Sequence, residues 1–137
     1  MMKKLPLLPA VLLLCLSLTA CGRGKISRDL TVRYEPSQLY TEEDIGAGIR
    51  TAENYFRKNF SGCTLSSIGY AGDAKCLEEI EFARRNGMDE VMVLTSSFEV
   101  DGSGGDGSLN PNSEYTGWMW ILAWEEGGSW VHIDHGY

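Results

Sequence analysis

No apolar run in this sequence is long enough to cross a membrane. The longest covers residues 5–18, contains prolines at positions 6 and 9, and falls short of the roughly 20 residues that a spanning helix needs. Nucleophile motifs such as G-x-S-x-G are lacking as well, and no cysteine and histidine form a pattern typical of a thiol enzyme. These absences argue against a spanning helix and against the common classes of covalent catalysis.

Lysine and arginine are scarce and unevenly placed. The chain has 12 of them against 19 aspartates and glutamates, a formal net charge of −7. Between Cys21 and Tyr34 four bases stand against one acid, whereas residues 35–137 hold six bases against 18 acids. An acidic body is repelled by nucleic acid, and a basic segment is attracted to anionic lipid headgroups. We therefore expect no nucleic-acid partner, and a membrane surface near the N-terminal segment.

The N-terminal segment has the parts of a secretory signal: two lysines, the apolar run, and small residues before a cysteine. The stretch Leu18-Thr19-Ala20-Cys21 resembles the lipobox of bacterial lipoproteins. This resemblance implies that the Cys21 thiol receives a diacylglycerol and that residues 1–20 are removed. The mature chain would then be anchored by its lipid to the cell membrane, facing outward. The alternative is an ordinary cleaved signal peptide, which needs no cysteine at that position.

Residues 21–38, from the lipidated cysteine onward, contain glycine, proline and serine and no clear apolar period. This composition predicts a flexible basic tether without a core of its own. Residues 39–137 predict a single domain, because about 100 residues suffice for one hydrophobic core and are too few for two ordinary ones.

Two hydrophobic periods follow the tether. Apolar residues at spacings of three and four predict helices over 41–59 and 74–86, with Thr41 and Asp73 as N-caps. In the second helix Leu77 is expected to face inward. A period of two predicts strands over 63–70, 90–100, 115–125 and 129–137. The expected fold class is α+β, with two helices packed on a curved antiparallel sheet of about four strands.

Cys63 and Cys76 would be the two cysteines left in the domain after processing at Cys21. Such a pair in an exported protein can form a disulfide. The predicted elements place the two residues near opposite ends of one strand, roughly 23 Å apart, which is much farther than a disulfide can bridge. We expect two partly buried thiols, with the disulfide as the alternative.

Gly127 and Gly128 predict a two-residue turn between the last two strands, and this turn fixes a register in which Glu126 pairs with Ser129. In that register one strand face is expected to be core. It carries Trp118, Trp120, Trp124 and His135. The opposite face is expected to be mixed, and it carries Trp130, His132 and Asp134.

The mixed face offers candidate functional side chains. His132 and Asp134 form the one acid–base pair that the sequence proposes, with a partly exposed strand face as the alternative. Trp130 is a candidate for stacking on a sugar ring. A zinc site is not expected, because His135 would point away from His132.

The order of elements, together with Trp130, Asp134 and Gly136 in the last strand, resembles the cystatin-like α+β roll. This superfamily includes nuclear-transport-factor-like proteins and ketosteroid isomerase, and the resemblance implies a cavity in which a carboxylate or histidine acts as general base. Three further stretches, 59–65, 103–113 and 118–122, resemble a group of small lipoproteins of Firmicutes. That second resemblance implies no particular activity.

The 14-residue loop over 101–114 is the other candidate site. Its G-x-G-x-x-G spacing at 102–107 does not predict a dinucleotide site, because Asn110-Pro111 prevents the helix that such a site needs. Oxygen-bearing side chains alternate with small residues in the loop, as they do in calcium loops, although the spacing fits no EF-hand. The calcium alternative uses Asp101, Ser103, Asp106 and Asn110.

The sequence therefore predicts a non-enzymatic envelope lipoprotein that binds a small ligand or an envelope protein and has no resident cofactor. The expected contact residues are Asp101, Asp106, Asn110, Asn112 and Trp130. Two alternatives stay open: a cavity enzyme that uses His132 and Asp134, and a structural module stabilised by calcium.

Overall fold

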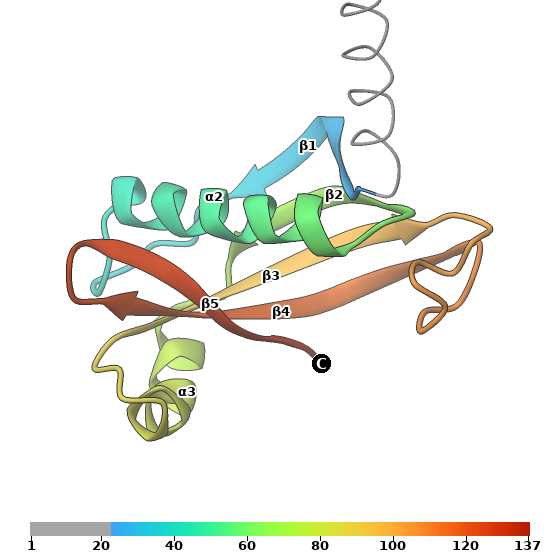
Figure 1. Cartoon of the computed structure of the whole chain (residues 1–137). Coiled ribbons are helices and arrows are strands. Elements are labelled where there is room, and N and C mark those ends of the chain that lie inside the picture. The colour runs from blue at the N-terminus through green and yellow to red at the C-terminus, as the bar shows by residue number, and fades with distance from the viewer. Residues whose placement is uncertain (1–22) are drawn as a thin grey trace, which may run out of the picture.

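The computed structural model describes residues 23–137, which form one five-stranded sheet with a helix on each side (Figure 1). The strands are β1 (Lys25–Arg33), β2 (Cys63–Tyr70), β3 (Val91–Val100), β4 (Ser113–Glu125) and β5 (Ser129–Gly136), and the helices are α2 (Glu42–Asn59) and α3 (Asp73–Arg85). The strands lie side by side in chain order, with β1 parallel to β2 and the other pairs antiparallel. The predicted α+β class is confirmed, with five strands in place of four.

Strand β1 corrects the expectation of a structureless tether. It pairs with β2 in parallel, from Lys25 opposite Thr64 to Arg33 opposite Gly69, with an irregularity between Ile26 and Thr31. Ile26 and Leu30 are half-buried against the core. Because β1 is the edge strand of the sheet, most of its side chains are exposed. Basic residues are therefore tolerated along it, and charged side chains on an edge strand also discourage pairing with another chain.

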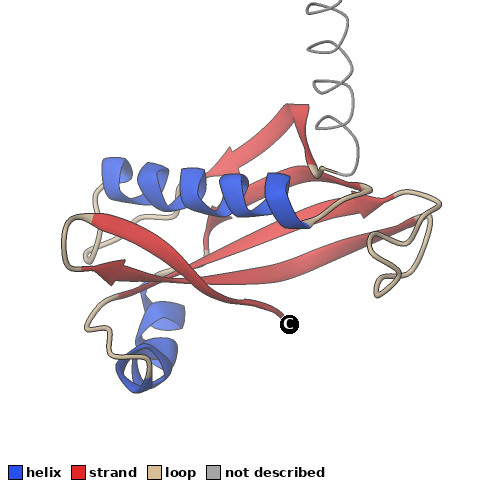
Figure 2. Ribbon diagram, in the orientation of Figure 1, coloured by secondary structure: helices blue, strands red, loops and turns tan. Residues whose placement is uncertain are grey.

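Helix α2 covers one face of the sheet, as its apolar stripe predicts (Figure 2). Thr41 is the N-cap: its hydroxyl accepts from the Asp44 backbone N–H, while the Asp44 carboxylate accepts from the Thr41 N–H. Four residues at helical spacing then face the sheet and are buried, namely Ile45, Ile49, Ala52 and Phe56.

Helix α3 covers one end of the opposite face, where Cys76 Sγ accepts from the Val93 N–H at 3.4 Å. Two expectations for this helix are wrong. The N-cap is Gly72, because the Asp73 carboxylate is held by the Ser37 and Tyr70 hydroxyls. Leu77 is 62% exposed, because the residues of α3 that pack on the core are Cys76, Ile80 and Ala83, at helical spacing, and Leu77 lies outside this stripe.

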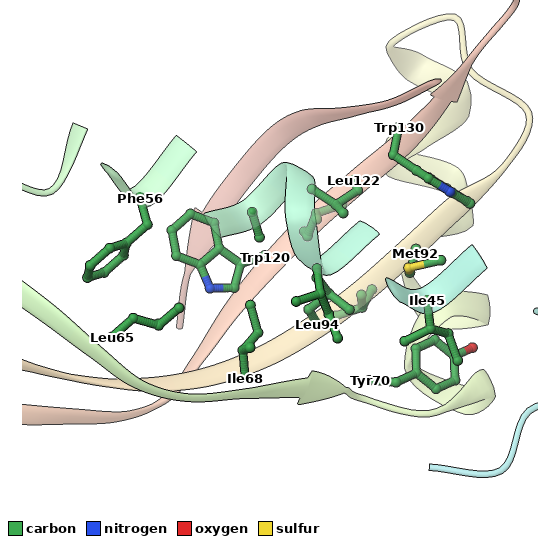
Figure 3. Packing of buried hydrophobic residues seen from close by; sticks show 14 of the residues in the cluster. Ile45, Phe56, Leu65, Ile68, Tyr70, Met92, Leu94, Trp120, Leu122 and Trp130 are labelled. Carbon is green, nitrogen blue, oxygen red and sulfur yellow. The ribbon is translucent and has the colours of Figure 1, made fainter. Parts of the chain in front are cut away.

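The core lies between α2 and the sheet, and Trp120 is at its centre (Figure 3). The indole is fully buried among apolar and aromatic neighbours, including Phe56 and Phe60. Its Nε1–H donates to Ser96 Oγ at 2.8 Å, and the Ser96 hydroxyl donates to the Trp118 carbonyl at 3.1 Å. This short chain of hydrogen bonds satisfies a polar group that would otherwise be unpaired in the core.

Cys63 and Cys76 are both free and both buried. The expectation of two thiols in place of a disulfide is therefore confirmed, although both are more deeply buried than expected. Burial raises the pKa of both thiols, that of Cys63 to about 11.

Candidate functional site

The candidate site begins with a bulge in β5. The adjacent β4 residues Ile121 and Leu122 pair with Asp134 and His132, so Ile133 is one extra residue on β5. In a regular strand His132 and Asp134, two residues apart, would share one face. The extra residue between them places them on opposite faces. His132 therefore lies on the α2 side of the sheet, opposite Leu122.

The bulge separates the predicted acid–base pair. Asp134 pairs with Ile121, so it lies on the face away from α2, and its carboxylate is exposed and accepts from the His135 backbone N–H at 2.8 Å. His132 and Asp134 thus occupy different faces of β5. The expectation that they share one face is wrong, because it assumed a strand without a bulge.

The same bulge brings the two histidines together, so the expectation that His135 points away from His132 is wrong. His132 Nε2 lies 2.9 Å from His135 Nδ1, and the ring centroids are 5.1 Å apart. The centroid separation exceeds the distance between the nitrogens by about two ring radii. The two nitrogens therefore face each other and form an N–H···N hydrogen bond. Among residues 23–137, no group of three His, Cys, Asp or Glu side chains is placed to hold a metal ion.

Aromatic rings enclose the histidine pair. The Tyr55 ring of α2 stacks on His132 with centroids 3.7 Å apart, and Trp118 stacks on His135 at 5.7 Å. Burial lowers the pKa of His132, the neighbouring His135 lowers it further, and Asp134 opposes the shift. Burial likewise lowers the pKa of His135. Burial therefore favours the neutral form of both rings.

A cleft of about 290 Å³ opens beside this pair, between the C-terminal end of α2 and the loop that precedes β4. One part of its wall is aromatic and contains Tyr55, Phe60, Trp118 and His135. The other part is polar and contains Asn59, Ser61, Asp106 and Ser108. The same small volume is therefore lined by aromatic rings and by hydrogen-bonding groups.

The loop that forms one wall of the cleft is tightly folded over residues 101–112. Asp101 Oδ1 accepts from the Ser103 N–H and hydroxyl, and Asp106 Oδ1 accepts in the same way from Ser108. These hydrogen bonds lower the pKa of both carboxyl groups. Each carboxylate is thus engaged in its own local turn.

The two asparagines of the loop act mainly through their backbones. The Asn110 N–H donates to the Tyr115 hydroxyl at 3.1 Å, and the Asn112 N–H donates to the Asp101 carbonyl at 3.0 Å. Asn112 has a φ of 54°, a left-handed conformation that asparagine tolerates better than most residues. Of the loop residues expected to bind a ligand, Asp106 lines the cleft, whereas Asp101 lines a separate depression of about 200 Å³ beside Arg23 and Lys25.

Trp130 does not form an exposed platform. It is one of the residues of the buried cluster (Figure 3) and is 7% exposed. It packs edge-on against Tyr40 and Trp124, with ring centroids 5.3 and 5.2 Å apart. The expectation is wrong because Glu125, not Glu126, pairs with Ser129 across a three-residue turn, which places Trp130 opposite Trp124. Trp118, which the sequence assigned to the core, is half-buried and lines the cleft instead.

A second depression, of about 370 Å³, lies on the face of the sheet away from α2. It is lined largely by hydroxyl side chains of β1, β2 and β3, among them Thr31, Ser67, Thr95 and Ser97. A polar surface of this kind is the ordinary solvated face of an antiparallel sheet. The aromatic cleft is therefore the better candidate for a ligand site.

No family model, curated protein or solved structure was found to match this chain. Its function is thus argued from its own residues. Cys21 and the rest of the lipobox lie outside the described residues, and in residues 23–137 neither helix combines the length and the apolar character needed to cross a bilayer.

Proposed function

We propose that this protein is a lipid-anchored envelope protein whose domain binds a small polar ligand, without catalysis, in the cleft between α2 and the 101–112 loop. The observation that carries the proposal is the lining of the cleft, which brings the aromatic residues Tyr55 and Trp118 together with the polar residues Asn59 and Asp106. Ligand sites commonly combine apolar or aromatic walls with a few polar groups that fix orientation.

A carbohydrate is the ligand class that best fits this lining. The flat rings can pack against the C–H faces of a sugar, while amide, carboxylate and hydroxyl groups can bind its hydroxyls. The volume of about 290 Å³ is at the small end of the range for ligand sites. We therefore propose a mono- or disaccharide unit of an envelope glycan.

Binding without catalysis is proposed because the expected acid–base pair is not assembled. Asp134, the carboxylate expected to act with His132, lies on the other face of β5. His132 Nε2 is instead hydrogen-bonded to His135 Nδ1. General acid–base catalysis by this pair would need both groups within reach of one substrate.

Lipid anchoring at Cys21 is proposed from the lipobox Leu18-Thr19-Ala20-Cys21 and the preceding signal-like segment. A diacylglycerol with a further acyl chain holds a protein stably on a bilayer. The domain would then act at the outer surface of the cell membrane, close to the envelope glycans.

Purification of the full-length lipoprotein from the envelope of its own host would test the proposal. Native mass spectrometry should detect a retained saccharide, and titration with N-acetylated amino sugars should change the tryptophan fluorescence. Asp106→Asn keeps an oxygen for the loop turn and removes the charge, so it should weaken binding about tenfold, as expected for a lost charged hydrogen bond. Asp89→Asn, at an exposed site before β3, is the matched control.

The proposal would be overturned if the purified protein carried no saccharide and none of the sugars altered its fluorescence. Equal losses of binding in Asp106→Asn and Asp89→Asn would place the ligand outside the cleft.

A further inference from the structure

The N-terminal end of the described chain is fixed on helix α2. The Gly24 N–H donates to the Arg57 carbonyl at 3.0 Å, and Gly24 is buried. A Cβ at this position would lie 2.3 Å from the Phe56 carbonyl oxygen and 2.9 Å from that of Phe60. Only glycine fits so close to the helix backbone, so the chain is held at the C-terminal end of α2.

This contact limits how far the domain can be from its anchor. Cys21 precedes Gly24 by three residues, which span at most about 10 Å when fully extended. The argument rests on the lipidation of Cys21 proposed above. An anchored domain with so short a connection keeps the surface around Gly24 near the lipid headgroups.

That surface belongs to a side of the molecule that is strongly basic. We define the basic side as residues 23–33, which include β1, and residues 45–59 of α2; the two segments lie next to each other (Figure 1). The basic side has seven bases against two acids, and it leaves out the acidic first turn of α2, which carries Glu42, Glu43 and Asp44 at the far end from Gly24. The rest of the described chain, including that turn, has three bases against 17 acids. The seven bases are all exposed: Arg23, Lys25, Arg28, Arg33, Arg50, Arg57 and Lys58.

Helix α2 meets the N-terminal segment on both sides of β1. Before the strand, the Gly24 N–H donates to the Arg57 carbonyl. After the strand, a Cβ on Gly46 would lie 3.5 Å from Arg50 Nη1 and 3.7 Å from the Tyr34 hydroxyl. Arg50 and Arg57 are seven residues apart, about two helical turns, so both lie near this segment.

The bases of the two sides also differ in their partners. On α3, Lys75 and Arg84 lie 3.1 and 3.0 Å from glutamates of the same helix. On the basic side, the one ion pair within the described residues joins Arg57 to Glu53 at 3.9 Å. Asp101 and Glu99 line a depression together with Arg23 and Lys25, without an ion pair between them. The remaining bases, Arg28, Arg33, Arg50 and Lys58, have no ion-pair partner among the described residues and are available to an external partner.

We propose that the basic side docks flat on the anionic headgroups of the membrane that holds the anchor. A short connection and several bases act together, because one lipid attachment concentrates the bases at the surface and the bases then orient the domain. The acidic remainder faces away from the membrane. In this orientation the Asn59–Ser61 wall of the cleft lies close to the membrane surface.

The test uses the purified lipoprotein reconstituted into vesicles of 30% phosphatidylglycerol in phosphatidylcholine, and into vesicles of phosphatidylcholine alone. Hydrogen exchange followed by mass spectrometry reports the exposure of segments 25–33 and 51–59, with α3 as an internal reference. Docking should slow exchange in the two basic segments in the anionic vesicles alone, and 0.5 M NaCl should reverse the effect because salt screens the attraction.

Matched variants separate charge at this side from total charge. The triple variant Lys25→Gln, Arg28→Gln, Lys58→Gln removes three charges from the basic side, and Lys75→Gln, Arg84→Gln, Arg85→Gln removes three from α3. Each base near an anionic surface contributes roughly a fivefold factor, so the first variant should reduce the ratio of docked to undocked protein by about a hundredfold. The second variant should leave it unchanged.

The outcomes distinguish docking from anchoring. If the protein lacks the mass of a diacylglycerol, and Cys21→Ser does not alter its membrane fraction, the proposed anchor and the docking proposal both fall. If the lipid is present but anionic vesicles protect neither basic segment, or both triple variants behave alike, the docking proposal alone is overturned.

Discussion

Removal of the Ser96 hydroxyl should destabilise the domain, because it leaves the buried N–H of Trp120 without a hydrogen-bond partner. Ser96 is buried, accepts from Trp120 Nε1–H and donates to the Trp118 carbonyl. Ser96→Ala leaves the buried indole N–H without a partner, which costs about 1–3 kcal/mol. For a domain of this size, each kcal/mol lowers the melting temperature by roughly 4 °C, so a fall of about 4–12 °C is expected.

A double-mutant cycle makes the reasoning refutable. Trp120→Phe removes the N–H, so Ser96→Ala should cost at least about 1 kcal/mol less in that background than in the wild type. Thermal and urea unfolding followed by circular dichroism measure the four proteins. Ser97→Ala, a change of the same size at a half-buried neighbour, should shift stability by less than about 0.5 kcal/mol. Additive effects of Ser96→Ala and Trp120→Phe would refute the proposed coupling.

Three further predictions follow from the structure. Burial lowers the pKa of His132 and His135 in the folded state, so the unfolded chain binds more protons at acidic pH. The urea midpoint of unfolding should therefore fall as the pH drops below about 6.5. A variant in which both histidines are changed to Gln should lack this fall. Gly24→Ala should lower the free energy of unfolding by about 1–3 kcal/mol and speed hydrogen exchange in β1, because the new methyl group meets the α2 backbone. Unchanged exchange in β1 would count against the contact between Gly24 and α2. Cys63 and Cys76 should resist iodoacetamide at pH 8 in the native protein and react in urea, as mass spectrometry can show, because both thiols are buried with raised pKa values.

The elements that sequence could predict are those whose signals are local. Thr41 and Asp44 cap α2 through contacts within one turn, and the stripe from Ile45 to Phe56 repeats within the same helix. Four of the strands have long apolar or alternating runs and were predicted within two residues at each end. Local periods therefore sufficed to predict two helices and four strands, although the N-cap predicted for α3 was wrong.

Strand β1 was missed because its stability comes from distant residues. Ile26, Leu30 and Val32 give a weak alternation, and the bases between them are typical of a solvated segment. The strand forms because it pairs with β2, which follows α2 in the sequence, and because Gly24 fits against the α2 backbone. Neither contact is visible in a window of sequence, and the weak alternation was the one available signal.

The candidate site was misjudged because two deviations of one residue occur in the last hairpin. Between the three-residue turn and the bulge, the register is one residue away from the predicted one, and this shift puts Trp130 and His132 on the α2 face. Beyond Ile133 the bulge cancels the shift, so Trp120 pairs with His135 and Ile121 with Asp134, as predicted. The error was thus confined to the few residues that decide whether His132 meets Asp134 or His135. A turn and a bulge that compensate each other preserve the core and change the chemistry of the strand between them, which is why the site was less predictable than the fold.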